Sequence, residues 1–506
     1  MNVSFEAKLL AGQSLNSLLK SRAEGTPDAP YLIDDAGGIL TFRNIEDRAK
    51  SVASMIAAQG VKPGESVAYA MSNGIDAALV ILGSLYGGYL TVAVNLVAGK
   101  ETISYVLDHS QSRLVLHDGG AKDLIIQALE GQENPPKMLE VGADAFTRVA
   151  EPFPDVSAGA DGLLMYTSGT TGRPKGVVLT HGNLLAGGAN AALAHALTPA
   201  DRALCVLPLY HINGLCVSLL GALVCGGSVV IPPKFRVSSF WDTVVRNGCT
   251  WLSLVPTQIS YLLHDVSFSG SLSGVRFARS ASAPLSPDVQ TAFETAFGVP
   301  IVETMGLTET AAQILSNPLP PNTRKIGSPG LAYGNEVVIA DPLGQEMVRG
   351  EEGELLVRGP NVMRTYLENE KGTNEALTSD GWLRTGDLGR MDEDGYVFIT
   401  GRLKELIIKG GENIAPREID DALYSHPDVI EAAAFALPCP HYGEKIEAGV
   451  VLKEGTEMDG SSLVAHCIDR VGSFKAPNQV HVFEELPKGP SGKIQRIKLA
   501  ALVSQD

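Results

Sequence analysis

One stretch of this chain decides its fold: Tyr166-Thr167-Ser168-Gly169-Thr170-Thr171-Gly172-Arg173-Pro174-Lys175-Gly176-Val177-Val178-Leu179-Thr180-His181. It follows an apolar run, residues 162–165, that predicts a β-strand. Glycines let a backbone approach a ligand and turn its N–H groups towards an anion, and hydroxyls add neutral donors. The stretch is not a Walker A motif, because Gly176 follows Lys175 where Ser or Thr would stand. Its composition predicts a loop that binds a polyphosphate, although an ordinary surface loop can have the same composition.

The overall composition narrows the classes of protein. At 506 residues the chain is too long for a single core, so we expect about two to four domains. Its hydrophobic content of 44% is ample for burial. A net charge of −17 argues against nucleic acid or an anionic membrane as a partner. Any basic site for phosphates must therefore be local.

No segment predicts export or insertion into a membrane. Residues 1–20 mix charged and apolar residues, unlike a secretory signal. The uncharged segment Ala77–Val94 changes character midway, which favours a helix followed by a buried strand over a membrane span. The six cysteines are scattered without a CxxC pair, and residues 503–506 are not a peroxisomal signal. We therefore expect a reduced, cytoplasmic protein with neither a disulfide framework nor a zinc site.

Helical and strand patterns alternate over the first 160 residues. Residues 45–58 have helical spacing, and residues 66–71 form an apolar run typical of a strand. Such alternation predicts α/β layers around a mainly parallel sheet. Residues 83–88 and 221–227 each resemble a helix that ends in glycine and leads into a buried strand. They indicate either two similar α/β halves or a chance likeness between glycine-rich turns.

The rest of the chain predicts two further units. Residues 327–400 are rich in strands and turns. A separate small unit follows, with a helix that begins at Pro416. The predicted fold class is therefore α/β: a large N-terminal domain, residues 1–403, of layered α/β sheets with a β-rich subdomain, and a small mobile α+β C-terminal domain, residues 404–506.

Three further motifs follow the phosphate loop. Thr308-Glu309 comes shortly after a predicted strand, and alone it would only suggest a helix N-cap. Asp387 and Arg402 flank one predicted hairpin, so their side chains can converge. Lys493 lies in a basic loop rich in glycine and proline near the end of the chain.

In this order, the four motifs resemble those of the adenylate-forming superfamily, which includes acyl-CoA synthetases, luciferases and adenylation domains. The likeness extends over essentially the whole chain, and the phosphate loop matches without a gap. It implies an AMP-forming acyl-CoA synthetase, an acid–thiol ligase that uses ATP, Mg²⁺ and coenzyme A. A carboxylate and ATP would give an acyl adenylate and pyrophosphate, and the thiol of CoA would then displace AMP.

The resemblance also implies roles for individual residues. Thr308 would bind the α-phosphate and Glu309 a Mg²⁺ ion that bridges phosphate oxygens. Lys493 would reach the reacting carboxylate, where charge develops. Asp387, assisted by Arg402, would accept hydrogen bonds from the ribose hydroxyls. The residues expected around the β- and γ-phosphates and the adenine are Thr167, Ser168, Gly169, Thr170, Thr171, Lys175 and Met305, the last in place of the usual aromatic residue.

The acyl pocket is expected to be short and polar, whereas a long-chain or aryl pocket would be mostly apolar. Residues 279–285 and 316–321 most resemble segments of oxalate–CoA ligases. In those enzymes a substrate-facing histidine stands where this chain has Ala312, and the smaller side chain is expected to leave room for a larger anion. We therefore predict a small polar or anionic acid, similar to oxalate, malonate or sulfoacetate. The expected lining residues are His211, Asn213, Arg279, Ser280, Ser282, Thr304 and Gln313, with His211 also expected to act in catalysis.

Several alternatives remain open. Arg279 could form a structural ion pair, in which case the acid would be a neutral short-chain or aryl acid. A stand-alone adenylation enzyme would load a carrier protein through the same first half-reaction, and a luciferase-like oxygenase is compatible with the fold. A non-catalytic relative would have lost Glu309, Lys493 or the phosphate loop, which are all present. The expected partners are a small carboxylic acid, ATP and CoA, and a homodimer is compatible with the sequence.

The resemblance implies a hinge at Lys404, where the small domain rotates between the half-reactions and exchanges the Lys493 loop for a face with Gly410 and Gly411. Lys404→Pro fixes φ and removes an N–H, so we expect it to spare acyl-adenylate formation and suppress thioester formation. Single-turnover pyrophosphate release without CoA and acyl-CoA formation with CoA measure the two steps. Lys404→Ala, which leaves the backbone free to rotate, is the control. Equal loss of both half-reactions in Lys404→Pro would refute the hinge.

Overall fold

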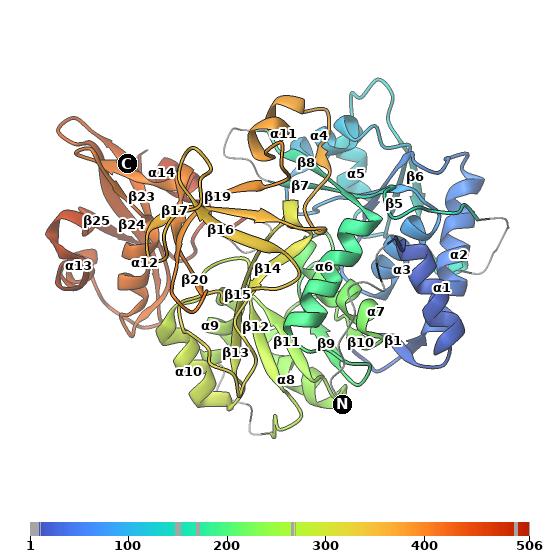
Figure 1. The fold of residues 1–506 in the computed structure, drawn as a ribbon, viewed down its shortest axis with the longest axis horizontal. Helices are drawn as coiled ribbons and strands as arrows, with labels where there is room; N and C mark the ends of the chain where they lie inside the picture. Colours follow the sequence, from blue (N-terminus) through green and yellow to red (C-terminus); the bar gives the residue numbers. More distant parts are fainter. Residues whose placement is uncertain are drawn as a thin grey trace.

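The computed structural model describes residue 10 and residues 12–146, 153–167, 173–264, 268, 270–489 and 494–504. Two large α/β sheets, a smaller antiparallel sheet and a C-terminal α+β unit make up this part of the chain. Figure 1 shows the C-terminal unit at one end of the molecule, away from helix α2. The predicted fold class is confirmed, while the boundary after residue 403 remains a prediction.

The first sheet has seven strands in the order β18-β8-β7-β4-β3-β5-β6. Its centre is parallel, and β8 pairs antiparallel with both β7 and β18. The strands are β3 (Ser66–Ala70), β4 (Leu90–Ala93), β5 (Leu114–His117), β6 (Lys137–Glu140), β7 (Asp161–Thr167), β8 (Lys175–Thr180) and β18 (Thr365–Tyr366). Strand β18, at one edge of the sheet, comes from a part of the chain far from β8.

The second sheet has nine strands in the order β15-β14-β13-β12-β11-β9-β10-β1-β2. It is parallel from β1 to β13 and antiparallel at both edges. The strands are β1 (Pro30–Ile33), β2 (Ile39–Thr41), β9 (Arg202–Cys205), β10 (Ser228–Val230), β11 (Trp251–Leu254), β12 (Phe277–Ser280), β13 (Ile301–Leu307), β14 (Ala312–Ser316) and β15 (Leu331–Ala332).

Helices separate and cover these two sheets. One apolar core joins the inner faces of both sheets through the helices α1 (Leu15–Gly25), α2 (Phe42–Ala58), α3 (Ile75–Tyr86), α6 (His181–Ala194), η3 (Asn213–Leu220) and α7 (Gly221–Cys225). The outer faces are covered by α4 (Lys100–His109) and α5 (Lys122–Leu129) on the first sheet, and by α8 (Val237–Arg246), α9 (Pro256–His264) and α10 (Pro287–Phe297) on the second. The layers therefore alternate between helix and sheet.

Two sequence-based expectations are met within this core. Ala77–Val94 spans most of α3 and all of β4, a buried helix followed by a buried strand. No helix among the described residues is both long and apolar enough to cross a membrane. The two glycine-rich segments are also equivalent in structure, since α3 leads into β4 of the first sheet and α7 into β10 of the second.

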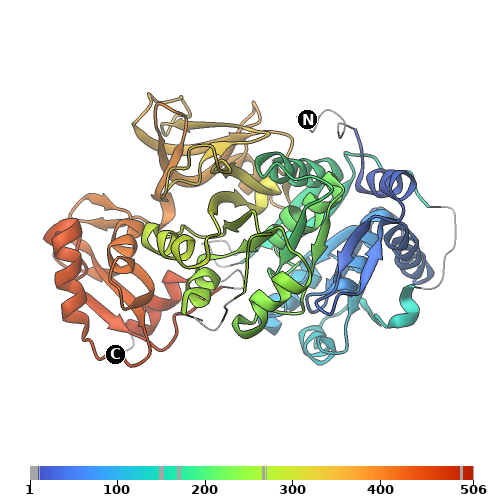
Figure 2. The same ribbon diagram turned by 90° about the horizontal axis from the view of Figure 1, so that it is seen from below.

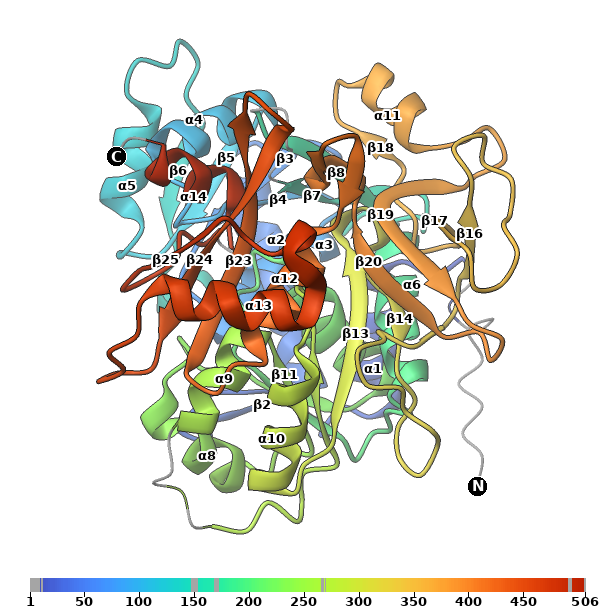
Figure 3. The same ribbon diagram turned by 90° about the vertical axis from the view of Figure 1, so that its left-hand side faces the viewer.

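The β-rich unit and the C-terminal unit follow. The former is an antiparallel sheet of β16 (Glu336–Ala340), β17 (Glu352–Arg358), β19 (Leu383–Met391) and β20 (Val397–Arg402), after which η5 (Leu403–Glu405) leads into the C-terminal unit. The elements of the latter are β21 (Ile407–Lys409), β22 (Glu412–Ile414), α12 (Pro416–Tyr424), β23 (Val429–Cys439), β24 (Gly443–Leu452), α13 (Gly460–Lys475), β25 (Gln479–Val482) and α14 (Arg496–Val503). Its apolar cores contain no described residue from the rest of the chain. Figures 2 and 3 show it beside α9 and α10.

A buried histidine at the start of α6 connects the phosphate-loop hairpin to the N-terminal helix. Thr180 caps α6, and Nδ1 of His181 accepts a hydrogen bond from the N–H of Leu15 at 3.3 Å. His181 is fully buried, and burial lowers its pKa to about 4. The folded protein therefore holds this ring neutral.

This burial predicts a loss of stability in weak acid. The unfolded chain binds a proton near pH 6.5 and the folded protein only near pH 4. Lowering the pH from 7 to 5.5 should therefore decrease the free energy of unfolding by about 1 kcal/mol through this group. His181→Asn, whose Oδ1 can accept the same hydrogen bond, should lack this part of the decrease. Urea unfolding of both proteins at the two pH values measures it, and identical pH dependence would contradict it.

Candidate active site

The stem of the phosphate loop is described, and its tip is not. Thr167 at the end of β7 pairs with Lys175 at the start of β8. Predicted loop residues Ser168, Gly169, Thr170 and Thr171 lie outside the described residues, as does Lys493. The stem therefore fixes where the loop leaves and re-enters the sheet.

Helix α4 holds both sides of this stem. The hydroxyl of Tyr105 donates to the carbonyl of Pro174 at 3.2 Å, and the guanidinium of Arg173 lies 5.5 Å from the centre of the same ring. On the other side, Nδ1 of His109 lies 2.9 Å from the hydroxyl of Tyr166. No motif in the sequence pointed to α4, because these contacts depend on packing across the sheet.

The turn with Thr308 and Glu309 lies close to the phosphate-loop stem. A 3-10 turn, η4 (Thr308–Thr310), connects β13 to β14. The carbonyl of Glu309 accepts from the N–H of Met363 at 2.7 Å. The Glu309 side chain accepts from the hydroxyl of Tyr366 at 2.9 Å, and Lys175 lies 4.7 Å from the centre of that ring. Tyr366 thus connects two predicted site residues, and sequence analysis missed it.

Asp387 and Arg402 converge as the hairpin predicted. They are directly opposite each other on β19 and β20, and Nε of Arg402 lies 2.6 Å from Oδ1 of the buried Asp387. Burial would lower the pKa of Arg402, but Asp387 raises it, with smaller contributions from Glu405 and Glu309. The influence of Glu309 indicates that this ion pair lies in the same region as the Thr308-Glu309 turn.

Arg279 lies in a buried polar network. It is 2% exposed, and its guanidinium donates to Oδ1 of Asn213 at 2.5 Å, to Oε1 of Gln313 at 3.2 Å and to the hydroxyl of Ser253 at 3.3 Å. These acceptors are all neutral. Among the described residues no carboxylate pairs with Arg279, so the structural ion pair considered above is not found there.

His195, which the sequence did not single out, supports this network. Its Nε2 lies 3.2 Å from Oε1 of Gln313. Burial, helped by the charges of Arg279 and Arg276, lowers the pKa of His195 to about 3, so the ring is neutral. Oε1 of Gln313 is thus shared by two donors. The Nε2 of Gln313 is buried and has no hydrogen-bond partner within the described ranges.

Of the other predicted pocket residues, some contact the Arg279 network and others do not. Nδ2 of Asn213 donates to the hydroxyl of Ser282 at 3.3 Å, which brings Ser282 to the network. Ser280 follows Arg279 in β12 and therefore points to the opposite face, the face of Ala278. Thr304 donates from its hydroxyl to the backbone carbonyl of Ser280 at 3.1 Å. The structure brings Asn213, Ser282 and Gln313 to Arg279 but separates Ser280 from it.

His211 and Met305 each pack against neighbouring side chains. The rings of His211 and Tyr210 are 4.9 Å apart. Asn73 supports this loop, because its Oδ1 accepts from the N–H of Leu209 at 3.1 Å. Met305 is half-buried and packs against the apolar core between β14 and the antiparallel sheet.

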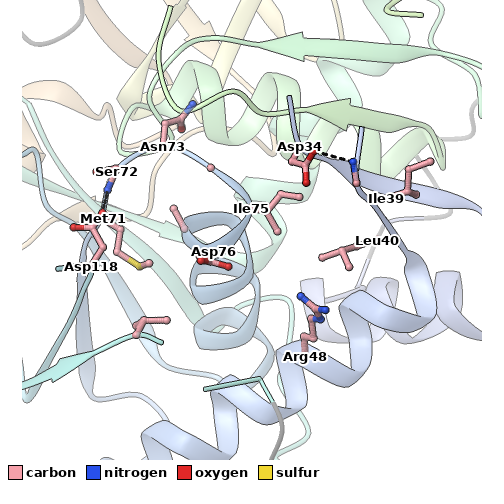
Figure 4. Close-up of a pocket in the computed structure, with 14 residues that line it drawn as sticks. Asp34, Ile39, Leu40, Arg48, Met71, Ser72, Asn73, Ile75, Asp76 and Asp118 are labelled. Atoms are coloured by element: carbon pink, nitrogen blue, oxygen red, sulfur yellow. Dashed lines mark hydrogen bonds between the residues drawn. The ribbon is translucent and has the colours of Figure 1, made fainter. Parts of the chain in front are cut away.

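Asn73 also lines a cavity of about 550 Å³ at the carboxyl ends of β3 and β5 (Figure 4). Asp34, Arg48, Asp76 and Asp118 surround it. None of the predicted site residues lines this cavity.

The C-terminal unit presents two different surfaces. Nζ of Lys488 lies 3.4 Å from the hydroxyl of Tyr261 in α9, so the segment before the predicted Lys493 loop contacts the large α/β unit. Gly410 and Gly411 adopt φ of +62° and +87° and are exposed to solvent. Lys404 is exposed in η5. The side of this unit with Lys488 therefore contacts α9, whereas Gly410 and Gly411 are exposed.

The donors suit a magnesium–nucleotide complex. No cluster of three or more potential metal-ligating side chains occurs in the described ranges. Mg²⁺ at nucleotide sites usually takes one or two carboxylates and completes its shell with phosphates and water. Glu309, with one carboxylate oxygen bonded to Tyr366, fits that donor set.

Comparison with known proteins identifies the family. The AMP-binding enzyme model matches residues 19–367, and its C-terminal domain model matches residues 418–493. A sulfoacetate–CoA ligase of Cupriavidus necator is 46% identical over 99% of both chains, and an oxalate–CoA ligase of Arabidopsis thaliana is 35% identical over 96% of this chain and 97% of its own. The crystal structure of ATP-bound MatB from Rhodopseudomonas palustris has a TM-score of 0.89 at 29% identity, covering 97% of this chain and 99% of that chain.

These matches define the protein class as adenylate-forming. The chain belongs to the AMP-binding enzyme family, and within it is an AMP-forming acyl-CoA synthetase, as the sequence motifs predicted.

Gly306 provides a test of the Thr308-Glu309 turn. A Cβ at this position would lie 1.8 Å from the carbonyl oxygen of Ala312, on the opposite strand of the hairpin. Gly306→Ala should therefore push β13 from β14, displace Glu309 and lower the rate of adenylation about 100-fold. Gly274→Ala, with nothing within 4 Å, is the matched control. Pyrophosphate release measures both, and activity of Gly306→Ala within twofold of the unmodified enzyme would contradict the expectation.

Proposed function

We propose that this enzyme joins a small anionic carboxylic acid to coenzyme A at the expense of ATP. The acid carboxylate attacks the α-phosphate and releases pyrophosphate, and the CoA thiol then attacks the acyl carbon and releases AMP. The observation that supports the anionic acid is Arg279, a fully buried guanidinium whose hydrogen-bond acceptors among the described residues are all neutral. A sulfoacetate-like acid is the first choice.

The charge of Arg279 explains this choice. A buried ion costs several kcal/mol in lost hydration unless an opposite charge offsets that loss. The neutral oxygens of Asn213, Ser253 and Gln313 satisfy hydrogen bonds but leave the positive charge uncompensated. Burial accordingly lowers the pKa of Arg279 to about 9. An acid with a second anionic group would supply the missing charge, and a neutral acid would not.

The polar network around Arg279 also suits a second anionic group that carries several oxygens. Gln313 has a buried Nε2 with no described partner, close to the guanidinium that its Oε1 accepts from. Two kinds of donor can therefore converge on one multi-oxygen group, a sulfonate or a carboxylate. Ala312 has a smaller side chain than the histidine that oxalate–CoA ligases carry at the corresponding place. A curated relative at 46% identity is named for sulfoacetate and another at 35% for oxalate, which supports the same chemical class.

Attack of a carboxylate on a phosphate brings two anions together, and we propose that the nucleotide residues neutralise part of this negative charge. We assign the phosphate loop and Lys175 to the β- and γ-phosphates, Thr308 to the α-phosphate, and Lys493 to the reacting carboxylate. Glu309 would hold Mg²⁺, which would offset phosphate charge when bound. Asp387 accepts from the ribose hydroxyls while Arg402 orients it through the 2.6 Å contact. A carboxylate nucleophile needs no general base.

The second half-reaction requires movement of the C-terminal unit. Lys488 contacts Tyr261, whereas Gly410 and Gly411 are exposed. This arrangement supports an adenylate-forming state, and rotation at Lys404 would bring the glycine face to the site. We accordingly place the domain boundary between residues 403 and 404.

The cellular setting follows from the cysteines and the charge. All six cysteines are free, which suits a reducing cytoplasm. With a net charge of −17 we propose no nucleic-acid or membrane partner, and a homodimer as the assembly to be examined by sedimentation.

Pyrophosphate release on a panel of acids, with and without CoA, tests the proposed function. Sulfoacetate, malonate and oxalate are compared with acetate, propionate and benzoate. We expect dianions to be preferred and CoA to be consumed. Arg279→Met should raise KM for the dianions about 100-fold and leave KM for ATP unchanged. Arg358→Met, on an exposed ion pair, is the control.

Two outcomes would overturn the proposal. Full activity of Arg279→Glu on dianions would remove the role of Arg279. Adenylation that proceeds normally while CoA is never consumed would favour a carrier protein as the thiol substrate.

A further inference from the structure

Tyr366 occupies a fixed place between two parts of the nucleotide site. Its strand, β18, pairs antiparallel with β8, so that Tyr366 lies opposite Val177, two residues after Lys175. The N–H of Tyr366 donates to the hydroxyl of Thr373 at 3.0 Å. The residue is 7% exposed. Backbone pairing and burial therefore hold the ring in one position.

Each end of the Tyr366 side chain contacts a charged residue. The hydroxyl donates to Oε1 of Glu309 at 2.9 Å. The ring centre lies 4.7 Å from Nζ of Lys175, within the range of a cation–π contact. No ion pair joins these two described residues directly. The aromatic ring thus stands between a cation and an anion that could otherwise neutralise each other.

This separation matters for a site that must bind both phosphate and metal. A direct Lys175–Glu309 pair would have to break before Lys175 could meet a phosphate or Glu309 a cation. The ring attracts the ammonium without removing its charge. The hydroxyl occupies one carboxylate oxygen and leaves the other available, in the way that hydrogen bonds commonly orient metal-ligating carboxylates.

We infer that Tyr366 is a positioning residue for the magnesium–ATP complex: its hydroxyl orients the Glu309 carboxylate for Mg²⁺, and its ring holds Lys175 ready for the phosphates. This inference rests on the proposed role of Glu309 as the metal ligand. It assigns to β18 a part in catalysis, because the hydrogen bond that orients the carboxylate comes from outside the Thr308-Glu309 motif.

Binding of α,β-methylene-ATP, measured by calorimetry at a series of Mg²⁺ concentrations and without Mg²⁺, separates the two contacts. Tyr366→Phe removes only the hydroxyl, so the Mg²⁺ concentration for half-maximal effect should rise about tenfold, with metal-free affinity unchanged. Tyr366→Leu also removes the ring and should weaken metal-free binding about threefold. Tyr396→Phe, which loses a hydroxyl donating to Thr323 at 2.6 Å, is the matched control and should bind as the unmodified protein does.

The result with Glu309→Gln distinguishes failure of this inference from failure of the proposed metal site. If Glu309→Gln loses the Mg²⁺ dependence and Tyr366→Phe keeps it unchanged, Tyr366 does not orient the carboxylate. If Glu309→Gln itself keeps the Mg²⁺ dependence, the proposed metal ligand is wrong. Equal weakening of Tyr366→Phe with and without Mg²⁺ would show a purely structural role and would also overturn the inference.

Discussion

The pairing of β8 with β7 on one side and β18 on the other is the interaction on which the candidate site depends. It holds the ends of the phosphate loop at one edge of the first sheet and brings Tyr366 beside Lys175. The Glu309 turn belongs to the second sheet and reaches the same place through Tyr366 and Met363. Since the two sheets share one apolar core, their relative position is set by packing and not by the motifs.

Two arginines illustrate how environment determines the role of a buried charge. Arg402 is paired with Asp387, so its charge is compensated within the protein and its geometry is fixed. Arg279 has only neutral described partners, so its charge is compensated only if a ligand supplies an anion. The first arrangement suits the support of a neighbouring carboxylate, and the second suits selection of a charged acid. The same residue type therefore lies in two different electrostatic environments.

A contact between residues close in the sequence was predicted correctly, and several contacts between distant elements were missed. Asp387 and Arg402 were correctly expected to meet, because one hairpin joins them and antiparallel pairing places them opposite each other. Ser280 was expected to line the same pocket as Arg279, but adjacent residues of a strand point to opposite faces of the sheet. The pairing of β12 with β11 and β13 fixes which of the two faces each side chain occupies. Tyr366, His195 and Asn73 were missed because nothing near them in sequence indicates a site. Their contacts come from other sheets or helices.

The sequence by itself determined the fold class, through its alternating helix and strand patterns, and the reaction type, because four short motifs in order resemble those of the adenylate-forming superfamily. A glycine-rich loop after a strand, a Thr-Glu pair and a basic terminal loop can each be found in the sequence without the structure. Only the tertiary structure decided which side chains share a surface, which charges are compensated and which residue holds the carboxylate of Glu309. The physical reason is that burial and long-range hydrogen bonding depend on how the sheets pack, and the sequence around each residue does not contain that information.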